Sequence, residues 1–310
     1  MDVRENAHDW ALQQFGIGQP VPRSEDPKLL KGEGRYTDDI NLPGQAYAVI
    51  VRSRVAHGIL RKVETSEARA MPGVLGVLTA ADLAAYGTFK CVMTFPNRDG
   101  TPMKLPVWTA LATDRVRCVG DAIACVVAET PAQAKDAAEA VFAEIDGLPA
   151  VTSAKEAAKP GAPQLYDDVP NNTCLDFHFG DAEKVQEAFA RAAHVTRVEL
   201  VNNRLVVCAM EPRSAIGSFD AASGRWTLHV GSQGVFGLRN QIANDILKVP
   251  AEKVRVLTGN VGGSFGMKAM AYPEYTCLFH AARALGRPVK WTDERSESFV
   301  SDSHGRDLTR

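Results

Sequence analysis

A cluster of three glycines within five positions constrains this chain more than any other feature of its sequence. Gly262, Gly263 and Gly266 surround one serine and one phenylalanine, and an apolar run at 254–258 leads into them. Glycine adopts positive φ and lets the backbone approach a ligand closely, so such a loop can offer several N–H donors to an anion or an oxo group. Since a helical pattern follows near Tyr275, the segment predicts strand, loop and helix. The loop is then either a cofactor loop or a tight turn between packed elements.

The common phosphate-binding motifs do not fit this loop. A Walker loop needs glycine immediately before its lysine and serine or threonine after it, but Met267 precedes Lys268 and Ala269 follows it. The dinucleotide pattern G-x-G-x-x-G also fails, because Gly262 and Gly263 are adjacent. The loop is therefore neither an obvious ATP site nor an obvious dinucleotide site.

The composition indicates an ordinary soluble chain of about two domains. It has 310 residues, a formal net charge of −2 and 45% apolar residues, which are typical globular values. Without a basic excess, nucleic acid is a poor expectation for a partner. No apolar run reaches the roughly 18 residues of a membrane-spanning helix, and the N-terminus lacks the apolar core of a signal peptide. We therefore expect no membrane span and a cytoplasmic location.

The six cysteines show no spacing typical of a metal or cluster site. None of them forms a C-x-x-C pair, and the seven histidines are scattered. Zinc and iron–sulfur sites need such spacings. Cys125 and Cys208 lie in apolar runs that are typical of buried strands, where cysteine behaves as a small hydrophobic residue.

The order of predicted elements divides the chain into four parts. Residues 1–24 are polar and predict an N-terminal arm, and 25–150 alternate strands with helices as in an α/β unit. Residues 151–165 are rich in alanine, proline and glycine and predict a linker before a second unit at 166–310. Apolar and β-branched runs predict strands at 46–52, 58–64, 74–79, 122–128, 195–200, 205–209, 254–258 and 289–292. Cap residues and helical periodicity predict helices at about 131–142, 182–193 and 274–285, with another that Ser232 and Gln233 open.

Several short motifs occur together in this order along the chain. In the second unit they are residues 210–213 (MEPR), 231–233 (GSQ), 262–266 (GGSFG), 293–299 and 302–307, and in the first unit 53–59, 72–74 and 119–124. Together they resemble the large, molybdopterin-binding subunit of the xanthine dehydrogenase/aldehyde oxidase family, which includes carbon monoxide dehydrogenase. The resemblance covers about 20–310. It implies a mixed α/β (α+β) fold, with an α/β-hammerhead domain at 25–150 followed by the first, incomplete part of a molybdopterin-binding domain at 166–310.

The resemblance also implies roles for individual residues. Gln233 matches a glutamine whose amide lies beside an oxo ligand of molybdenum, where a neutral NH₂ group can donate without protonating the oxo group. Phe265 and Gly266 match the step that packs at the pterin and the metal, while Gly262, Gly263 and Ser264 complete the loop that holds the cofactor. No metal ligand is implied in the chain, because the pterin dithiolene holds the molybdenum. For Gln233 and Phe265 the alternatives are an ordinary polar residue opening a helix and simple core packing.

Charged residues near these motifs have other expected roles. Glu211 and Arg213 are expected to form a buried pair beside the site, with a structural or a supporting role. Glu294, Arg295 and residues 302–307 predict a solvated or interdomain network rather than a catalytic one. Ala269 departs from the family's purine hydroxylases, which carry an acid at this position, so xanthine is a poor substrate expectation.

The resemblance implies further components outside this chain. The family's large subunits are more than twice as long, and their essential glutamate, the base that activates a metal-bound hydroxyl, lies in a far C-terminal segment that has no counterpart here. The chain thus resembles a truncated or split N-terminal half. The implied cofactor is molybdopterin with molybdenum, in its cytosine dinucleotide form. FAD and [2Fe-2S] clusters are expected on a medium and a small partner subunit, and the base on a C-terminal half of the large subunit.

Two functions follow from these expectations. The first is a component of a molybdenum hydroxylase that oxidises an aldehyde, an N-heterocycle or carbon monoxide with water and is inactive without a partner carrying the glutamate. The alternative is a non-catalytic fragment that acts as an interaction or scaffold module. Molybdenum in the purified protein would distinguish the two.

Overall fold

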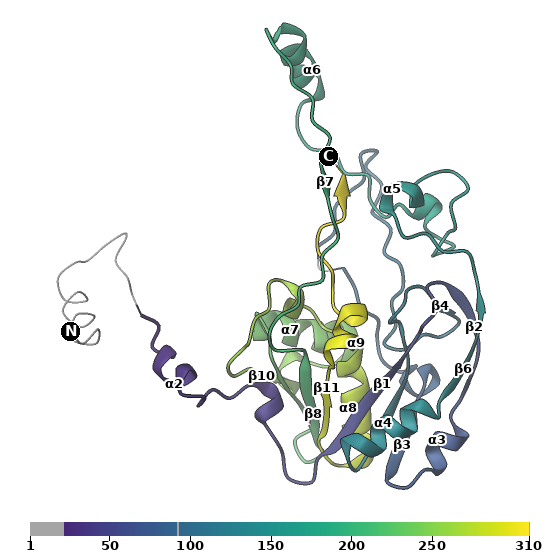
Figure 1. Ribbon diagram of the computed structural model, residues 1–310, viewed down its shortest axis with the longest axis vertical. Helices are drawn as coiled ribbons and strands as arrows, with labels where there is room; N and C mark the ends of the chain where they lie inside the picture. The colour runs from purple at the N-terminus through teal and green to yellow at the C-terminus, as the bar shows by residue number, and fades with distance from the viewer. Residues whose placement is uncertain (1–21, 92, 310) are drawn as a thin grey trace, which may run out of the picture.

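A seven-stranded mixed sheet forms the centre of the molecule (Figure 1). The computed structural model describes residues 22–91 and 93–309, so nearly all of the predicted arm at 1–24 lies outside the described residues. The strand order is β10-β9-β8-β11-β1-β5-β3. The bounds are Val254–Leu257 (β10), Arg225–Val230 (β9), Ser214–Asp220 (β8), Val289–Thr292 (β11), Ala46–Arg52 (β1), Ala122–Ala128 (β5) and Val74–Leu78 (β3).

This sheet joins the two predicted units. β1, from the first unit, pairs in parallel with β11 from the second and antiparallel with β5. One hydrophobic cluster runs beneath both parts and includes Ile50 and Val127 as well as Leu228 and Trp291. The mixed α/β fold expected from the sequence is therefore confirmed, while the division at 25–150 and 166–310 stays a prediction about sequence units.

Two smaller sheets flank the central one. The first consists of β4, β2 and β6, and the second of β12 and β7. Their bounds are Arg115–Val116 (β4), Gly58–Glu64 (β2), Phe142–Gly147 (β6), Leu308–Thr309 (β12) and Val201–Asn202 (β7).

Short helices connect the strands, and the longest packs beneath the sheet. The helices are Asp26–Leu30 (α2), Ser66–Ala70 (α3), Pro131–Glu139 (α4), Ala154–Ala157 (α5), Ala182–Arg191 (α6), Val235–Gln241 (α7), Pro273–Leu285 (α8) and Arg295–Ser301 (α9). α5 lies inside the predicted linker at 151–165. α7 continues directly into a π-helical turn, Ile242–Leu247.

β5 is the strand of this sheet that is buried on both faces throughout its length. All seven of its residues are buried. Because side chains alternate along a strand, Cys125 and Val127 join the cluster that contains α8, whereas Ala124 and Val126 join the cluster beneath α3 and α4. A strand buried on both faces is apolar throughout, and this run predicted the strand with its correct bounds.

α8 lies very close to the sheet, and a glycine permits the approach. A Cβ on Gly217 of β8 would lie 2.9 Å from the Cβ of Leu278. The helix buries Tyr275 and Phe279 and ends at Gly286, which has φ 65°. A left-handed residue at this position closes a helix without the penalty of a Cβ, so the predicted helix at 274–285 is confirmed.

Two predicted strands are wrong. Residues 195–200 are irregular, and 205–209 form only a single bridge, from Leu205 to Gly305. Cys208 is exposed rather than buried and has φ 52°, a left-handed conformation that no strand contains. Their β-branched residues have no sheet to pair with, because residues 176–205 are all exposed. Strand propensity follows from packing on a half-buried sheet, and it does not create one.

The exposed segment 176–205 projects away from the sheet and carries α6 at its tip (Figure 1). The side chain of Asp181 caps α6 by accepting from the Lys184 N–H, at 3.0 Å, as the sequence predicts. Val185 and Phe189 are both exposed on this helix, and Phe179 before it is 91% exposed. The segment therefore presents an apolar helix face that nothing in the described part of the chain covers.

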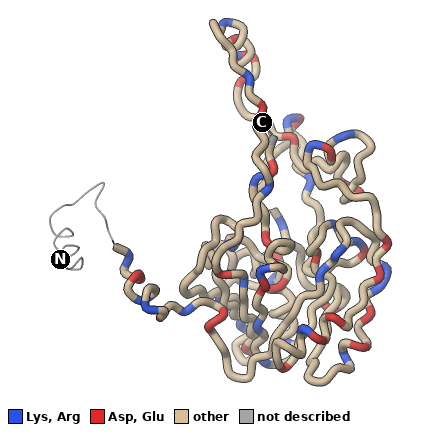
Figure 2. The backbone as a smooth tube through the Cα atoms, in the orientation of Figure 1, with Lys and Arg blue, Asp and Glu red and all other residues tan. Residues whose placement is uncertain are grey.

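Charged residues of both signs are interspersed along the backbone in the view of Figure 2. Within the described ranges, no helix has the length and apolar character needed to cross a membrane.

Candidate functional site

The two predicted site segments lie side by side because their strands are parallel neighbours. β9 leads into residues 231–233, and β10 leads into the glycine loop at 262–266. These strands pair in parallel, with Val254 opposite Trp226 and Leu257 opposite His229. The carboxyl ends of parallel strands meet at the same edge of a sheet, where ligand sites commonly form. The pairing therefore brings Gln233 to the glycine loop.

Gln233 is held by the loop through its side-chain oxygen. Its Oε1 accepts from the Gly266 N–H at 2.7 Å and from the hydroxyl of Ser264. Its own N–H donates to the Lys268 carbonyl at 3.2 Å. A backbone N–H can only donate, so the side-chain atom facing Gly266 must be the oxygen. The NH₂ group is therefore on the other side of the amide from this contact; the residue is exposed, and no hydrogen bond of its side-chain nitrogen is found among the described residues.

The loop backbone is wound into left-handed conformations. Gly263 has φ 104°, Phe265 φ 48° and Gly266 φ 100°. For phenylalanine this conformation is unfavourable by about 1–3 kcal/mol, yet its side chain is 79% exposed and gains little packing. Core packing therefore does not account for Phe265. A strained, exposed aromatic side chain beside outward-facing donors is the arrangement expected where a ligand completes the packing.

The predicted pair of Glu211 with Arg213 is wrong. Glu211 faces the loop, where its Oε2 accepts from the Gly262 N–H at 2.8 Å and from Lys268 Nζ at 2.8 Å. Arg213 instead pairs with Glu274 on α8 and with Asp302 at the end of α9, so it does not contact Glu211. Lys268 has a buried side chain. The sequence offered Lys268 only as a mismatch to a phosphate motif, so this contact was missed.

Arg213 is instead the centre of a buried ionic network. Its Nη1 lies 3.0 Å from Glu274 Oε2 and its Nε 2.6 Å from Asp302 Oδ1, and its guanidinium stacks over the Tyr272 ring at 3.8 Å. Asp302 was expected in a solvated or interdomain network; it is buried rather than solvated, and the network reaches the first unit through Arg52. Sequence spacing could not indicate this, because Arg213 and Asp302 are 89 positions apart.

Arg52 connects this network to the first unit. From the end of β1 its Nη2 lies 2.6 Å from both Glu274 and Glu297. Burial by itself raises the pKa of Glu274, but the positive charges of Arg213 and Arg52 outweigh it and hold the pKa at about 2. Glu274 is thus ionised and shared by both arginines, which ties α8 to β1.

Asp293 is the remaining acid of this network and has the opposite behaviour. Its Oδ2 accepts from the Ser298 hydroxyl at 2.8 Å and lies 3.8 Å from Arg213 Nη2. Burial raises its pKa, the nearby Glu297 carboxylate adds to the increase, and the pKa reaches about 8 despite Arg213. Two arginines face four carboxyl groups here, so a proton on one acid reduces the excess negative charge.

The raised pKa of Asp293 predicts that the stability of the protein depends on pH, and that replacing Asp293 by asparagine removes this dependence. An acid with a raised pKa binds its proton more tightly in the folded state, so its contribution is present at low pH and is lost as pH rises through 8. Between pH 6 and 8 this loss amounts to about 2 kcal/mol. Glu274 adds no slope there, since its lowered pKa matters only below about pH 4.5.

We expect Asp293→Asn to remove this decline, with urea unfolding at pH 6, 7 and 8 as the measurement. Histidines titrate in both proteins, so their contribution drops out when the free energies of unfolding of wild type and variant are subtracted at each pH. Parallel pH profiles of the two proteins would contradict a protonated Asp293.

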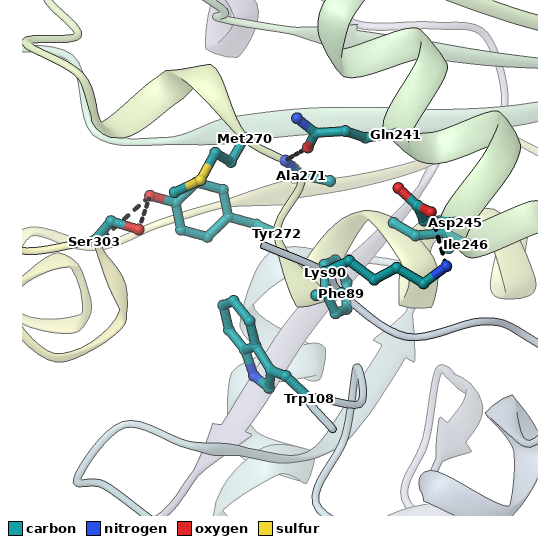
Figure 3. A pocket seen from close by; sticks show the side chains of 10 residues that line it. All are labelled: Phe89, Lys90, Trp108, Gln241, Asp245, Ile246, Met270, Ala271, Tyr272 and Ser303. Atoms are coloured by element: carbon teal, nitrogen blue, oxygen red, sulfur yellow. Dashed lines mark hydrogen bonds and ion pairs between the residues drawn. The ribbon is translucent and has the colours of Figure 1, made fainter. Parts of the chain in front are cut away.

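A small cavity lies where the segment after the glycine loop meets the first unit (Figure 3). Its volume is about 30 Å³, and Phe89 and Trp108 face Tyr272 across it. Tyr272 donates its hydroxyl to the Met267 carbonyl at 2.7 Å, and the Ala271 N–H donates to Gln241 Oε1 at 3.0 Å. These bonds anchor the chain immediately after the loop.

The predicted site residues therefore lie together in space, although the side chain of Phe265 does not pack against the others. Ser264 and Gly266 each donate a hydrogen bond to Gln233, and Gly262 donates one to Glu211. The Phe265 side chain points into solvent. Within the described residues no three histidine, cysteine or acidic side chains are grouped as in a metal site. The role of Gln233 and of the loop at 262–266 in binding a cofactor stays a prediction.

Known proteins match almost the whole chain. The family described as aldehyde oxidase and xanthine dehydrogenase, a/b hammerhead domain, matches residues 31–149, and the molybdopterin cofactor-binding domain matches residues 165–309. The carbon monoxide dehydrogenase large chain of Hydrogenophaga pseudoflava is 33% identical over 96% of this chain and 38% of its own length. The nicotine 6-hydroxylase large subunit of Paenarthrobacter nicotinovorans is 34% identical over 94% of this chain and 35% of its own.

A solved structure shares the fold as well. Quinoline 2-oxidoreductase from Pseudomonas putida 86 superposes with a TM-score of 0.82 and 31% identity, covering 95% of this chain and 36% of that one. The chain therefore spans little more than a third of the length of these relatives.

Proposed function

The chain belongs to the aldehyde oxidase and xanthine dehydrogenase family, and from this premise we propose that it forms part of the molybdopterin site of a molybdenum hydroxylase. The observation that carries the proposal is the fixed orientation of Gln233. Its oxygen is bonded to Gly266 and Ser264, so its NH₂ group faces outward beside the strained, exposed Phe265. The proposal places the cofactor against this face.

The residues present fit a molybdopterin. In the described chain, the N–H groups of Gly263, Ser264 and Phe265 have no protein acceptor, and the left-handed conformations around them are typical of backbone anion sites. The nearest lysine, Lys268, is neutralised by Glu211. The donors offered are thus neutral N–H groups, each worth about 1.5–3 kcal/mol to a charged acceptor.

The chain's own residues would bind and orient the cofactor. When bound, a molybdenum-bearing molybdopterin supplies the two-electron redox chemistry. Gln233 would donate from its NH₂ group to an acceptor oxygen of the cofactor, and the loop N–H groups would receive its anionic part. Phe265 would pack against it and exclude water, which relieves the exposure of its ring. The cytosine dinucleotide form is our expectation for the cofactor.

We place the catalytic base outside residues 1–310. Glu211 is the carboxylate that contacts the loop, but its Oε2 accepts from Lys268 and Gly262 and its Oε1 is buried, so neither oxygen is open to a substrate. The relatives named above are about 2.6 to 2.9 times as long as the part matched here, which leaves room for such a base. The apolar face of α6, with Val185 and Phe189, supports a protein partner.

The proposed partners are a C-terminal half of the large subunit and subunits carrying FAD and [2Fe-2S] clusters. The proposed substrate is an aldehyde, an N-heterocycle or carbon monoxide. Ala269 stands where purine hydroxylases carry an acid, which argues against a purine. The cytoplasmic location expected from the sequence stays a prediction. Turnover of any such substrate by this chain alone, with an artificial electron acceptor, would contradict the need for a partner.

Molybdenum content tests the proposal directly. We expect the chain, expressed in a host that makes molybdopterin, to retain molybdenum after purification, as measured by elemental analysis. The alternative, a scaffold module without cofactor, predicts none.

Replacing Gln233 by glutamate tests the outward NH₂ group. Glutamate can still accept from Gly266, but its second oxygen cannot donate and carries charge towards an anionic cofactor. We expect the molybdenum content at limiting cofactor to fall about 10- to 100-fold. Gln186→Glu makes the same chemical change on the exposed α6 and should leave the content unchanged. Equal contents in all three proteins would show that Gln233 does not touch the cofactor.

A further inference from the structure

We propose that Lys268 is the positioning residue of the glycine loop: its buried ion pair with Glu211 sets the loop geometry before any cofactor is bound. The consequence for cofactor retention rests on the proposed function, whereas the effect on the loop does not. No sequence motif indicated this role, since Lys268 and Glu211 are 57 positions apart.

The side chain of Lys268 reaches across the loop to Glu211, in the irregular segment that precedes β8. It is 1% exposed, and its Nζ lies 2.8 Å from both the backbone carbonyl and Oε2 of Glu211. A buried ammonium needs such partners, because an unpaired charge away from water is strongly unfavourable. The pair therefore fixes the distance between residue 211 and residue 268.

Glu211 passes this constraint on to the start of the loop. Its N–H donates to the Gly262 carbonyl at 3.0 Å, and its Oε2 accepts from the Gly262 N–H at 2.8 Å. The two chains are so close that a Cβ on Gly262 would lie 2.6 Å from the Cβ of Glu211. Glu211 thus forms hydrogen bonds with both the N–H and the carbonyl of Gly262.

The backbone of Lys268 holds the end of the loop. Its N–H donates to Ser264 Oγ at 3.1 Å, and its carbonyl accepts from the Gln233 N–H at 3.2 Å and from Ser232 Oγ at 3.3 Å. Through side chain and backbone together, Lys268 contacts the MEPR segment, the GSQ segment and the glycine loop. It is the point at which the three segments of the candidate site are fixed relative to one another.

Charge explains why this position needs a cation. Glu211 Oε1 is buried and has no partner among the described residues. Without Lys268, the carboxylate would retain one backbone donor, from Gly262, and would be a buried charge with too few partners. It would then move towards water and take Gly262 with it, and its negative charge would also repel an anionic cofactor.

The pair also differs from the Arg213 network in what it contacts. Arg213 joins α8, α9 and the adjoining strand end, and so supports the global fold. In the described chain, by contrast, the Lys268 and Glu211 side chains form hydrogen bonds only with each other, with the Glu211 carbonyl and with Gly262. Loss of Lys268 should therefore affect the loop more than the rest of the molecule.

Hydrogen exchange of the complete chain, measured by mass spectrometry on peptides covering 258–268 and α8, tests the proposal. For Lys268→Met we expect exchange in the loop peptide to accelerate about 10-fold or more, with little change in α8. The matched control is Lys290→Met, since Lys290 is also buried and pairs with Asp38 at 3.0 Å away from the loop. This control should leave loop exchange unchanged.

A neutral double variant separates positioning from simple loss of stability. In Lys268→Met with Glu211→Gln, no charge remains to be expelled, and the amide oxygen can still accept from Gly262. We expect loop exchange to return most of the way to the wild-type rate. Unchanged loop exchange in Lys268→Met, or an equal acceleration in the loop and α8, would overturn the proposal.

Molybdenum content of the same variants links the loop to the proposed function. If the wild-type protein holds molybdenum, Lys268→Met should lose about 10-fold or more and the double variant should regain part of it. If the wild type holds none, the proposed function fails, while the exchange experiment still decides whether Lys268 positions the loop. A variant that keeps its full molybdenum content while hydrogen exchange in its loop is faster would show that cofactor binding does not depend on loop order. That result would overturn the claim that Lys268 supports cofactor retention.

Discussion

Replacing Arg213 by methionine is expected to lower the free energy of unfolding by about 3–5 kcal/mol. The guanidinium is buried and holds Glu274, Asp302 and Asp293 together. Methionine fills similar volume but leaves these acids without their shared cation. The buried acids left without a compensating charge account for most of the expected loss. The loss is large, because a single domain has only about 5–15 kcal/mol of net stability.

Urea unfolding at pH 7, followed by tryptophan fluorescence, measures this loss because Trp291 lies 5.0 Å from the Arg213 guanidinium. The control is Arg61→Met. Arg61 pairs with Asp146 at 2.7 Å on the surface, where both side chains are more than half exposed, and such a pair is worth less than about 1 kcal/mol. A loss of under 1 kcal/mol in Arg213→Met would mean that the acids take up protons freely and that the network does not support the fold.

Gly262→Ala is expected to have the largest effect on the candidate site. The added methyl would lie 2.6 Å from the Glu211 Cβ and 3.3 Å from its backbone nitrogen. Neither atom is the flexible end of a side chain, so the backbone of the loop must shift. A shift of even a few tenths of an ångström moves the Gly262 and Gly266 N–H groups from their partners. We expect the molybdenum content to fall at least 10-fold.

Gly237→Ala is the matched control for this substitution. Gly237 lies in α7, and no atom lies within 4 Å of the position of its Cβ. Alanine should stabilise the helix there by about 0.5–1 kcal/mol and leave the molybdenum content unchanged. Comparable molybdenum contents in both variants would show that the close contact at Gly262 is not needed for cofactor retention.

The strands of the central sheet show how far local pattern can predict this fold. Residues 46–52, 58–64, 122–128 and 289–292 are strands with the predicted bounds, because each is a dense apolar or β-branched run between turn residues. The same reasoning was wrong at 195–200 and 205–209. Those runs have similar composition, but apart from the single bridge at Leu205 they have no partner strand, and composition does not indicate whether a partner strand is present.

The candidate site shows the same limit. Gln233 and the loop at 262–266 were identified by their motifs, and the structure places them in contact. Glu211 was expected to pair with Arg213, two positions along, but pairs with Lys268. Asp302 was expected in a solvated or interdomain network, and the structure excludes the solvated alternative because Asp302 is buried against Arg213. In each case the true partner lies more than 50 positions away, and a linear pattern does not indicate it.

The sequence by itself determined the mixed α/β class, most strand positions and the motifs of the glycine loop, because these depend on local composition and on backbone freedom at Gly263 and Gly266. Only the tertiary structure decided that β9 and β10 are parallel neighbours, and hence that Gln233 and the loop share one sheet edge. It also decided which buried charges pair. A buried charge takes whichever opposite charge the packed fold brings within about 3 Å, and that choice depends on the whole arrangement of the chain rather than on any segment of it.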